Sequence, residues 1–196
     1  MLRYFLFYKP FQVLSQFSAE GNKKTLADYL KNIPKDIYPV GRLDFDSEGL
    51  LLLSNDKKLT QYLLEPRNKH QRTYYVQVEG LITEEAIQKL KSGVSISVDG
   101  KTYHTLPTQA DILTKEPILP ERNPPIRFRQ NIPTSWISLS LIEGKNRQVR
   151  KMTAAVGFPT LRLVRYSIGD ITISGWESGS IKEVKATDLS SLFKKA

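Results

Sequence analysis

The stretch from Val40 to Asp56 reads V-G-R-L-D-F-D-S-E-G-L-L-L-L-S-N-D, and the rest of the chain is interpreted around it. Its four consecutive leucines, bounded by turn-forming residues, predict a strand that is buried on both faces. Three carboxylates and an arginine come directly before that strand: Asp44, Asp46, Glu48 and Arg42. Polar side chains that lead into a buried strand are held in fixed positions, as an active site requires. The simpler alternative is a solvated acidic turn.

Composition limits the classes of function. The chain has 196 residues, enough for one substantial domain or two small halves that share a core. Its net charge of +9 and pI of about 9.6 favour a polyanionic partner, with nucleic acid as the first candidate. The absence of cysteine excludes disulfides, thiolate catalysis and cysteine-bound metals, and two histidines disfavour a catalytic triad or a multi-histidine metal site. The apolar run from Tyr4 to Tyr8 is too short for a signal peptide or a membrane span, so we expect a cytoplasmic protein.

Strand patterns outnumber helix patterns along the chain. Strands are predicted at residues 3–8, 37–40, 50–53, 72–78, 94–98, 101–105, 136–142 and 160–166. Helices are predicted at residues 25–31, 57–64, 84–92, 146–156 and 187–193, with Asn146 as the cap of the fourth. This order, with its hairpin signals, predicts an α+β fold with a largely antiparallel sheet.

A proline-rich segment covers residues 114–133 and carries Arg122, Arg127 and Arg129. Prolines at this density predict an ordered, extended loop without ladder hydrogen bonds. Such a loop is either functional or a plain insertion.

A second segment, from Lys145 through Gly169, contains cations but no acidic residue. Its cations are Lys145, Arg147, Arg150, Lys151, Arg162 and Arg165. On the predicted helix, residues 147, 150 and 151 share one face. Cations near a helix N-terminus are disfavoured by the helix dipole unless an anion is bound, so this face is interpreted as a grip for phosphate or carboxylate. The alternative is a solvated helix face.

The acidic stretch has two chemical interpretations. It begins like a calcium-binding EF-hand loop, but the match then fails: the ninth position is Leu52, and the twelfth, where a bidentate Glu belongs, is Asn55. A carboxylate beside a sugar C1′ would instead stabilise positive charge during glycosidic chemistry, and in a basic protein the sugar is that of a nucleotide. The nearby arginine favours the ionised form of Asp44, as a nucleophile or charge stabiliser. If the backbone is extended here, Arg42, Asp44 and Asp46 point the same way.

Four segments resemble the signatures of the RsuA-type RNA pseudouridine synthases. They are G-R-L-D-F-D-S-E-G-L-L-L-L-S-N-D (residues 41–56), E-G-K-N-R-Q-V-R-K-M (143–152), L-V-R-Y-S-I-G (163–169) and F-Y-K-P (7–10). The resemblance covers residues 3 to 185. The segments 124–136 and 152–166 resemble a subgroup that modifies large-subunit ribosomal RNA and lacks the N-terminal S4-like module of other members, and we expect no such module here.

The resemblance implies the fold and the activity. It implies one pseudouridine synthase catalytic domain over residues 1–196, with halves near 1–70 and 71–196 that share a largely antiparallel sheet around a central basic cleft. It also implies an isomerase without cofactor or metal that converts a specific uridine of large-subunit ribosomal RNA to pseudouridine. The expected partner is this RNA or a pre-ribosomal particle, and the expected state is a monomer. Two alternatives remain: a non-catalytic ribosomal RNA-binding or assembly factor, and a nucleoside or RNA glycosidase.

The resemblance also assigns roles to individual residues. Asp44 matches the essential aspartate, Arg42 the arginine that helps to flip the uridine, and Tyr74 the tyrosine that stacks on the uracil. Arg150 matches the arginine that pairs with the catalytic aspartate, and Leu163 an apolar residue of the uracil pocket. The expected RNA-binding residues are Lys145, Arg147, Lys151, Arg162, Arg165, Arg127 and Arg129. Arg72 stands where the family usually has lysine, and no catalytic role is assigned to it.

Overall fold

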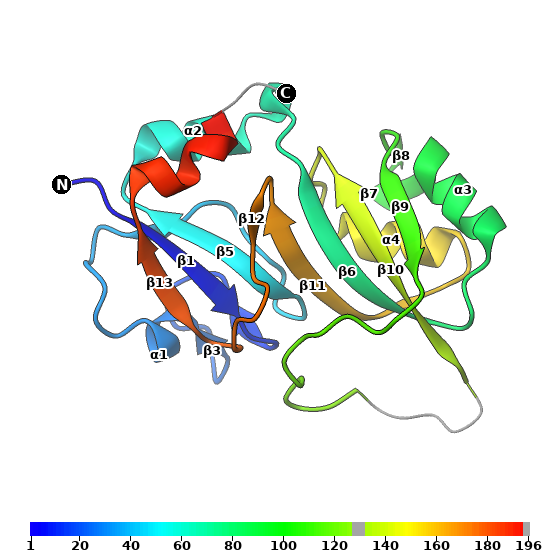
Figure 1. The fold of residues 1–196 in the computed structure, drawn as a ribbon, viewed down its shortest axis with the longest axis horizontal. Coiled ribbons are helices and arrows are strands. Elements are labelled where there is room, and N and C mark those ends of the chain that lie inside the picture. The colour runs from blue at the N-terminus through cyan, green and yellow to red at the C-terminus, as the bar shows by residue number, and fades with distance from the viewer. Residues whose placement is uncertain (127–131, 194–196) are drawn as a thin grey trace.

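The computed structural model describes residues 1–126 and 132–193, and its main feature is one nine-stranded sheet that crosses the molecule (Figure 1). The strand order is β13-β1-β5-β11-β6-β10-β9, with β4 beside β5 and β12 beside β11. Every neighbouring pair in this sheet is antiparallel except β5 and β11. The predicted α+β class with a largely antiparallel sheet is therefore confirmed.

The elements have the following bounds. The strands of the large sheet are β1 (Tyr4–Lys9), β4 (Tyr38–Pro39), β5 (Glu48–Ser54), β6 (Arg72–Glu79), β9 (Gln109–Leu113), β10 (Thr134–Leu141), β11 (Thr160–Ile168), β12 (Ile171–Thr172) and β13 (Ile181–Val184). Two smaller sheets pair β2 (Val13–Leu14) with β3 (Lys24–Thr25), and β7 (Ser95–Val98) with β8 (Lys101–His104). The helices are α1 (Leu26–Tyr29), α2 (Lys57–Leu64), α3 (Glu84–Ser92), α4 (Gln148–Ala155) and the 3-10 helices η1 (Pro66–Asn68) and η2 (Ala186–Phe193).

The leucine run is the centre of the N-terminal half, as predicted. All seven residues of β5 are buried. Leu50 and Leu52 belong to a core shared with α2 and η2, whereas Leu51 and Leu53 belong to the core on the other face, shared with α1. Because successive side chains of a strand point to opposite faces, four adjacent leucines can fill two cores at once.

The two halves are not continuous in sequence. The chain leaves the C-terminal half after β11, and β13 pairs with β1 at the far edge of the N-terminal half. Leu189 and Leu192 of η2 then pack into the same core as α2. The last segment of the chain, with β13 and η2, therefore packs with the N-terminal half. The C-terminal segment 187–193, predicted as a helix, lies within the 3-10 helix η2.

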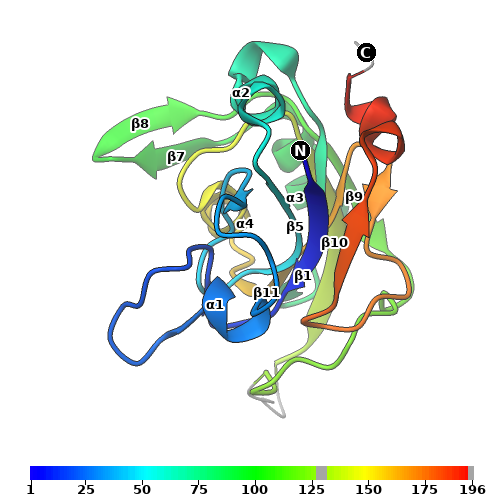
Figure 2. The same ribbon diagram turned by 90° about the vertical axis from the view of Figure 1, so that its left-hand side faces the viewer.

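The C-terminal half packs α3 and α4 against β6 and β10 around a separate core. Thr83 caps α3 through a hydrogen bond from the backbone N–H of Ala86, which confirms the predicted start of this helix. Residues 114–126 and 132–133 of the proline-rich loop contain no helix or strand, in agreement with the prediction. Figure 2 shows hairpin β7–β8 and the loop between β2 and β3 projecting on the same side of the molecule. No helix in the described part of the chain is long and apolar enough to cross a membrane.

Candidate active site

Asp44 lies in a tight turn that ends where β5 begins. The backbone N–H of Ser47 donates to the carbonyl oxygen of Asp44 at 3.0 Å, so residues 44–47 turn. The backbone is therefore not extended over residues 44–47, so the condition for Arg42, Asp44 and Asp46 to point the same way is not met. The backbone N–H of Gln12 donates to the carbonyl oxygen of Phe45 at 2.8 Å and ties the turn to the N-terminal loop. The side chain of Asp44 is 38% exposed and faces a cleft.

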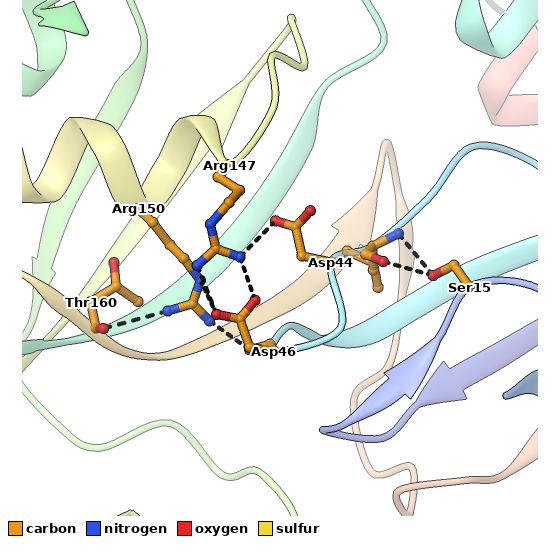
Figure 3. Close-up of polar contacts among 7 residues, drawn as sticks. Ser15, Asp44, Asp46, Arg147, Arg150 and Thr160 are labelled. Atoms are coloured by element: carbon orange, nitrogen blue, oxygen red, sulfur yellow. Dashed lines mark hydrogen bonds and ion pairs between the residues drawn. The ribbon is translucent and has the colours of Figure 1, made fainter. Parts of the chain in front are cut away.

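A buried serine holds the residue before Asp44. The hydroxyl of Ser15 donates to the carbonyl oxygen of Leu43 at 2.8 Å and accepts from its N–H at 3.1 Å (Figure 3). Both residues are buried, so neither contact competes with water. Sequence reasoning missed Ser15, because it lies in a segment interpreted only as loop and its partner is 28 positions away.

Two arginines of the C-terminal half converge on Asp46 (Figure 3). Arg147 donates from both terminal nitrogens to the two carboxylate oxygens of Asp46, each at 2.8 Å. Arg150 places Nε 3.3 Å from Asp46 Oδ2 and donates from Nη2 to the Asp46 carbonyl oxygen. The expected pair between Arg150 and Asp44 is therefore not present, because the turn brings the Asp46 carboxylate to α4. The cation that approaches Asp44 is Arg147 instead, with 4.0 Å between Nη1 and Oδ2.

The start of α4 differs from the prediction. Arg147, and not Asn146, is the N-cap residue, and its left-handed backbone (φ 54°) takes it out of the helix. No side chain caps this helix end by a hydrogen bond. Hydrogen bonds inside the segment hold it instead. The side-chain amide of Gln148 accepts from the backbone N–H of Lys145 and donates to the carboxylate of Glu143. Glu143 in turn accepts from the Tyr103 hydroxyl, which ties the segment to hairpin β7–β8.

Asp44 forms part of the wall of a cleft of about 600 Å³ between the two halves. Arg42 lies on the same wall, whereas Tyr74 of β6 and Leu163 of β11 line the cleft from the shared sheet. Cations outnumber carboxylates in the lining: Arg42, Lys69, Arg72, Lys145, Arg147 and Arg165 against Asp44, Glu65 and Glu143. The expected central basic cleft is therefore confirmed.

Two of the expected RNA-binding arginines are buried. Arg162 makes two hydrogen bonds of 2.8 and 2.9 Å to Glu48 and a third to the carbonyl oxygen of Pro120. Arg165 is 4% exposed and donates from Nε to the carbonyl oxygen of Leu50. Burial lowers its pKa, and Tyr74 opposes that shift. Arg162 and Arg165 lie on opposite faces of β11, and each is paired inside the protein, so surface phosphate contacts do not fit the burial of either arginine.

The other expected cations differ in position. Lys145 is exposed, lines the cleft and lies 4.8 Å above the Tyr103 ring. Arg147 also lines the cleft, although its guanidinium is already engaged in an ion pair with Asp46. Lys151 is half-buried on α4 and is not in the cleft lining. Arg127 and Arg129 lie outside the described residues.

Other residues near the site carry contacts that the sequence did not predict. Arg72 donates to the carbonyl oxygens of Leu63 and His70, so it joins the end of α2 to the segment before β6. Lys9 is fully buried and donates to the carbonyl oxygens of Pro10 and Val13. A lysine in a short aromatic strand gives no sequence signal of complete burial, because lysine is usually exposed.

Burial and neighbouring charges shift the pKa in opposite directions at three of these groups. Burial opposes ionisation of Asp46, but the Arg147 hydrogen bond and the charges of Arg150 and Arg147 outweigh it and hold the Asp46 pKa below its usual range. Burial lowers the pKa of Arg150, and the charge of Asp46 opposes that shift. Burial lowers the pKa of Lys9 to about 7, although Glu48, Asp46 and Asp44 favour its charged form. Among the described residues, no group of three or more His, Asp or Glu side chains is arranged to hold a metal ion.

The chain is similar to known proteins over most of its length. A family model described as RNA pseudouridylate synthase matches residues 3–155. A curated protein of Vibrio parahaemolyticus, named ribosomal large subunit pseudouridine synthase E, is 51% identical over 180 residues, which are 92% of this chain and 73% of the relative. A protein of the same name from Xanthomonas axonopodis pv. citri is 50% identical over 167 residues, 84% of this chain and 85% of the relative. A crystal structure of a pseudouridylate synthase, 23% identical, has a TM-score of 0.78 over 98% of this chain and 74% of that one, and shows the same fold.

Proposed function

The chain belongs to the RNA pseudouridylate synthase family, and from that premise we propose that it converts a uridine of large-subunit ribosomal RNA to pseudouridine. The two relatives that are 51% and 50% identical over the aligned residues carry the name of a large-subunit enzyme. The reaction is an isomerisation: the N1–C1′ bond breaks, the uracil turns, a C5–C1′ bond forms, and the C5 proton is released while N1 gains one. No atom is added to or lost from the RNA.

The observation that carries this proposal is the position of Asp44. Its carboxylate is partly exposed on the wall of a basic cleft, and Ser15 and Ser47 hold the backbone on either side of it. Cleavage of a glycosidic bond builds positive charge at C1′, and a fixed carboxylate stabilises that charge or bonds to the carbon. We assign this role to Asp44.

Tyr74 and Leu163 supply a place for the uracil ring. They lie on the neighbouring strands β6 and β11 and both line the cleft. An aromatic ring beside a buried aliphatic side chain offers a flat apolar site for a flipped base. Tyr74 also presents a hydroxyl that can take part in removal of the C5 proton.

Arg42 and Lys145 are exposed cations that can meet the RNA in this cleft. Arg42 lies on the Asp44 wall, and Lys145 lies on the opposite half. Flipping a base costs a few kcal/mol of stacking, which an inserted arginine and contacts to the flipped base offset. We assign base flipping to Arg42 and phosphate contact to Lys145.

Residues 114–133 are proposed to select the substrate. The described part of this loop contacts the N-terminal half, because Arg122 lies 4.1 Å above the Phe11 ring. Within the loop, Arg122 donates to the carbonyl oxygens of Pro124 and Pro125. Arg162 binds the carbonyl oxygen of Pro120 at a second point. A loop that is anchored at two points and carries arginines can read RNA outside the flipped nucleotide.

The decisive experiment compares the wild-type protein with Asp44→Asn on an unmodified large-subunit ribosomal RNA transcript and on precursor particles. Pseudouridine is mapped by carbodiimide-dependent stops in primer extension, and RNA binding is measured in parallel. The proposal expects a stop made by the wild type and lost in Asp44→Asn, with binding retained. If neither substrate gains a stop from the wild type, the protein is a binding or assembly factor; release of free uracil would identify a glycosidase.

Three further points are proposed: the form of the RNA substrate, the location of the protein and its oligomeric state. Free ribosomal RNA and a pre-ribosomal particle are both candidates, and the comparison above separates them. A ribosomal RNA substrate supports a cytoplasmic location. A monomer is proposed as the oligomeric state, and sedimentation tests it.

A further inference from the structure

A second groove lies beside the turn that carries Asp44. Asp44 lines the active-site cleft, whereas Phe45, the next residue, lines this groove, which has a volume of about 640 Å³. Another wall comes from the loop between β2 and β3, which projects from the molecule in Figure 2. Residues 121–124 of the proline-rich loop also line it. The turn is therefore a wall that the cleft and the groove share.

Aromatic side chains line the groove. Phe11, Tyr29 and Phe45 belong to the lining, and each is half-buried. Lys23 approaches the Phe45 ring, with 5.7 Å between its Nζ atom and the ring centroid. The carboxylate partner of Lys23 is Glu20, in an exposed ion pair of the kind that contributes little in water. Lys23 can therefore exchange Glu20 for another anion, and the Phe45 ring can receive a flat partner.

Positive charge exceeds negative charge in the groove. The charged side chains of the lining are Lys23, Lys24 and Arg122, against Glu48 and Glu121. Glu48 is already neutralised by the buried Arg162, at 2.8 Å, which leaves three cations and one carboxylate. The lining also contains three amides, those of Gln12, Asn22 and Asn123. Rings, cations and amides are the groups that bind the bases, phosphates and base edges of single-stranded RNA.

We propose that this groove binds a nucleotide that flanks the target uridine in the substrate RNA, with its base stacked on Phe45 and its phosphate bound by Lys23 and Lys24. Because the turn separates the two sites, a strand whose uridine enters the cleft reaches the groove with a neighbouring nucleotide. The carbonyl oxygen of Phe45 accepts from the N–H of Gln12 at 2.8 Å, which fixes the turn on this side. The bound nucleotide adds affinity and orients the strand toward Asp44.

The inference rests on the proposed modification of RNA, and the two can fail separately. Filter binding of RNA needs no reaction. A wild type that makes no pseudouridine would refute the proposed function and leave the binding comparison valid, whereas groove variants with unchanged RNA affinity would refute the groove alone.

The first measurement is the Kd of a large-subunit ribosomal RNA transcript for the wild type, Phe45→Leu and Lys24→Gln. Phe45→Leu is expected to raise the Kd about tenfold, because one base stack is lost. Lys24→Gln is expected to raise it about fourfold at about 0.15 M salt and to reduce the slope of log K against log salt by about 0.7, as loss of one phosphate contact does. Phe45→Leu should leave that slope unchanged.

Phe17→Leu and Lys185→Gln are the matched controls. Phe17 is a half-buried ring and Lys185 an exposed lysine, and neither is among the described residues that line the groove or the cleft. Both variants should bind RNA as the wild type does, and circular dichroism checks that each variant is folded.

The second measurement changes the RNA. A fragment around the mapped uridine is made with an abasic sugar at each flanking position in turn and with 5-tritiated uridine at the target. Single-turnover rates below saturation are followed by tritium release, which reports loss of the C5 proton. One abasic position is expected to slow the wild type about tenfold and to cost Phe45→Leu nothing more, because its stack is already lost.

The proposal is overturned if Phe45→Leu and Lys24→Gln both bind RNA with the wild-type Kd, which would assign the groove to another kind of ligand. Equal losses in the two control variants would also overturn it, as would abasic effects that are the same in the wild type and Phe45→Leu. Should Phe45→Leu fail to fold, Lys24→Gln and the abasic series with the wild type decide, and no loss in either refutes the groove.

Discussion

Gly49 of β5 lies against the backbone of Arg165 of β11 so closely that a Cβ atom at Gly49 would collide with the Arg165 carbonyl group and backbone nitrogen. The two residues are partners in the one parallel strand pair of the large sheet, which is the pair that joins the halves. Gly49 also has φ of +107°, which favours glycine. The glycine therefore sets how closely the two halves approach at the cleft.

Gly49→Ala is expected to destabilise the fold by about 3 kcal/mol or more, because backbone atoms cannot move aside for the new Cβ and the backbone conformation is strained. Urea unfolding followed by circular dichroism measures the loss. Gly100→Ala is the matched control, since Gly100 has φ of +77° but no neighbouring atom within 4 Å of the place that a Cβ would take. Its cost is expected to be about 1 kcal/mol, from backbone strain alone. Equal losses at both positions would contradict the close-approach argument.

Ser15→Ala is expected to lower stability by about 1–3 kcal/mol, because it leaves the buried N–H and carbonyl oxygen of Leu43 without their partner. The single-turnover rate is expected to fall about tenfold, since Leu43 precedes Asp44 and loses its restraint. Thermal melting and tritium release measure the two effects. Ser18→Ala, an exposed change in the same loop, should alter neither quantity. An unchanged rate in a folded Ser15→Ala variant would show that the serine does not position Asp44.

The buried pair of Glu48 and Arg162 is expected to show non-additive losses. Arg162→Met alone should cost about 3–5 kcal/mol, because it leaves the Glu48 carboxylate buried without a partner. Adding Glu48→Gln to Arg162→Met is expected to restore part of that loss, since the unpaired charge is removed. Urea unfolding of both single variants and of the double variant completes the cycle. Additive losses would mean that the two side chains do not stabilise each other.

Lys9 is expected to make stability depend on pH above neutrality. In the folded protein burial lowers its pKa to about 7, whereas the unfolded chain keeps the ordinary value of 10.5. Between these values the unfolded state binds a proton that the folded state lacks, so the free energy of unfolding rises with pH. The full effect of one proton is about 1.4 kcal/mol per pH unit, and below the folded pKa the contribution is constant.

Lys9→Met is the comparison that isolates this effect, because other groups titrate as well. The wild type is expected to gain stability relative to Lys9→Met between about pH 7.5 and 9.5 in urea unfolding. Parallel pH curves for the two proteins would show that Lys9 keeps its ordinary pKa in the fold.

The arginines of the proline-rich loop are expected to affect the choice of uridine. Replacing Arg122, Arg127 and Arg129 together by Gln removes the positive charge but keeps most of the side-chain length. A shifted modification site, or a lower kcat/KM on ribosomal RNA with an unchanged rate on a short oligonucleotide, is the expected result of primer-extension mapping and kinetics. If site and rate both stay the same, the loop does not select the substrate.

Much of this protein is determined by local sequence. The leucine run and the strand and helix patterns predicted elements that the structure contains, because each depends on neighbouring residues and on burial of one or two faces. The four signature segments identified the family, and the cleft collects Arg42, Asp44, Tyr74 and Leu163 from segments far apart in sequence.

Only the tertiary structure decided which charged side chains form ion pairs with one another. The spacing of Arg147 and Arg150 indicated an anion grip, but only the turn at residues 44–47 makes Asp46 the anion. The strand β11 was predicted, yet its arginines were expected at the surface, and the packing of β5 and β6 on its two sides turns Arg162 onto Glu48 and Arg165 toward Tyr74. Helix and strand patterns report local periodicity, whereas an ion pair depends on how two distant segments pack, and no local pattern carries that information.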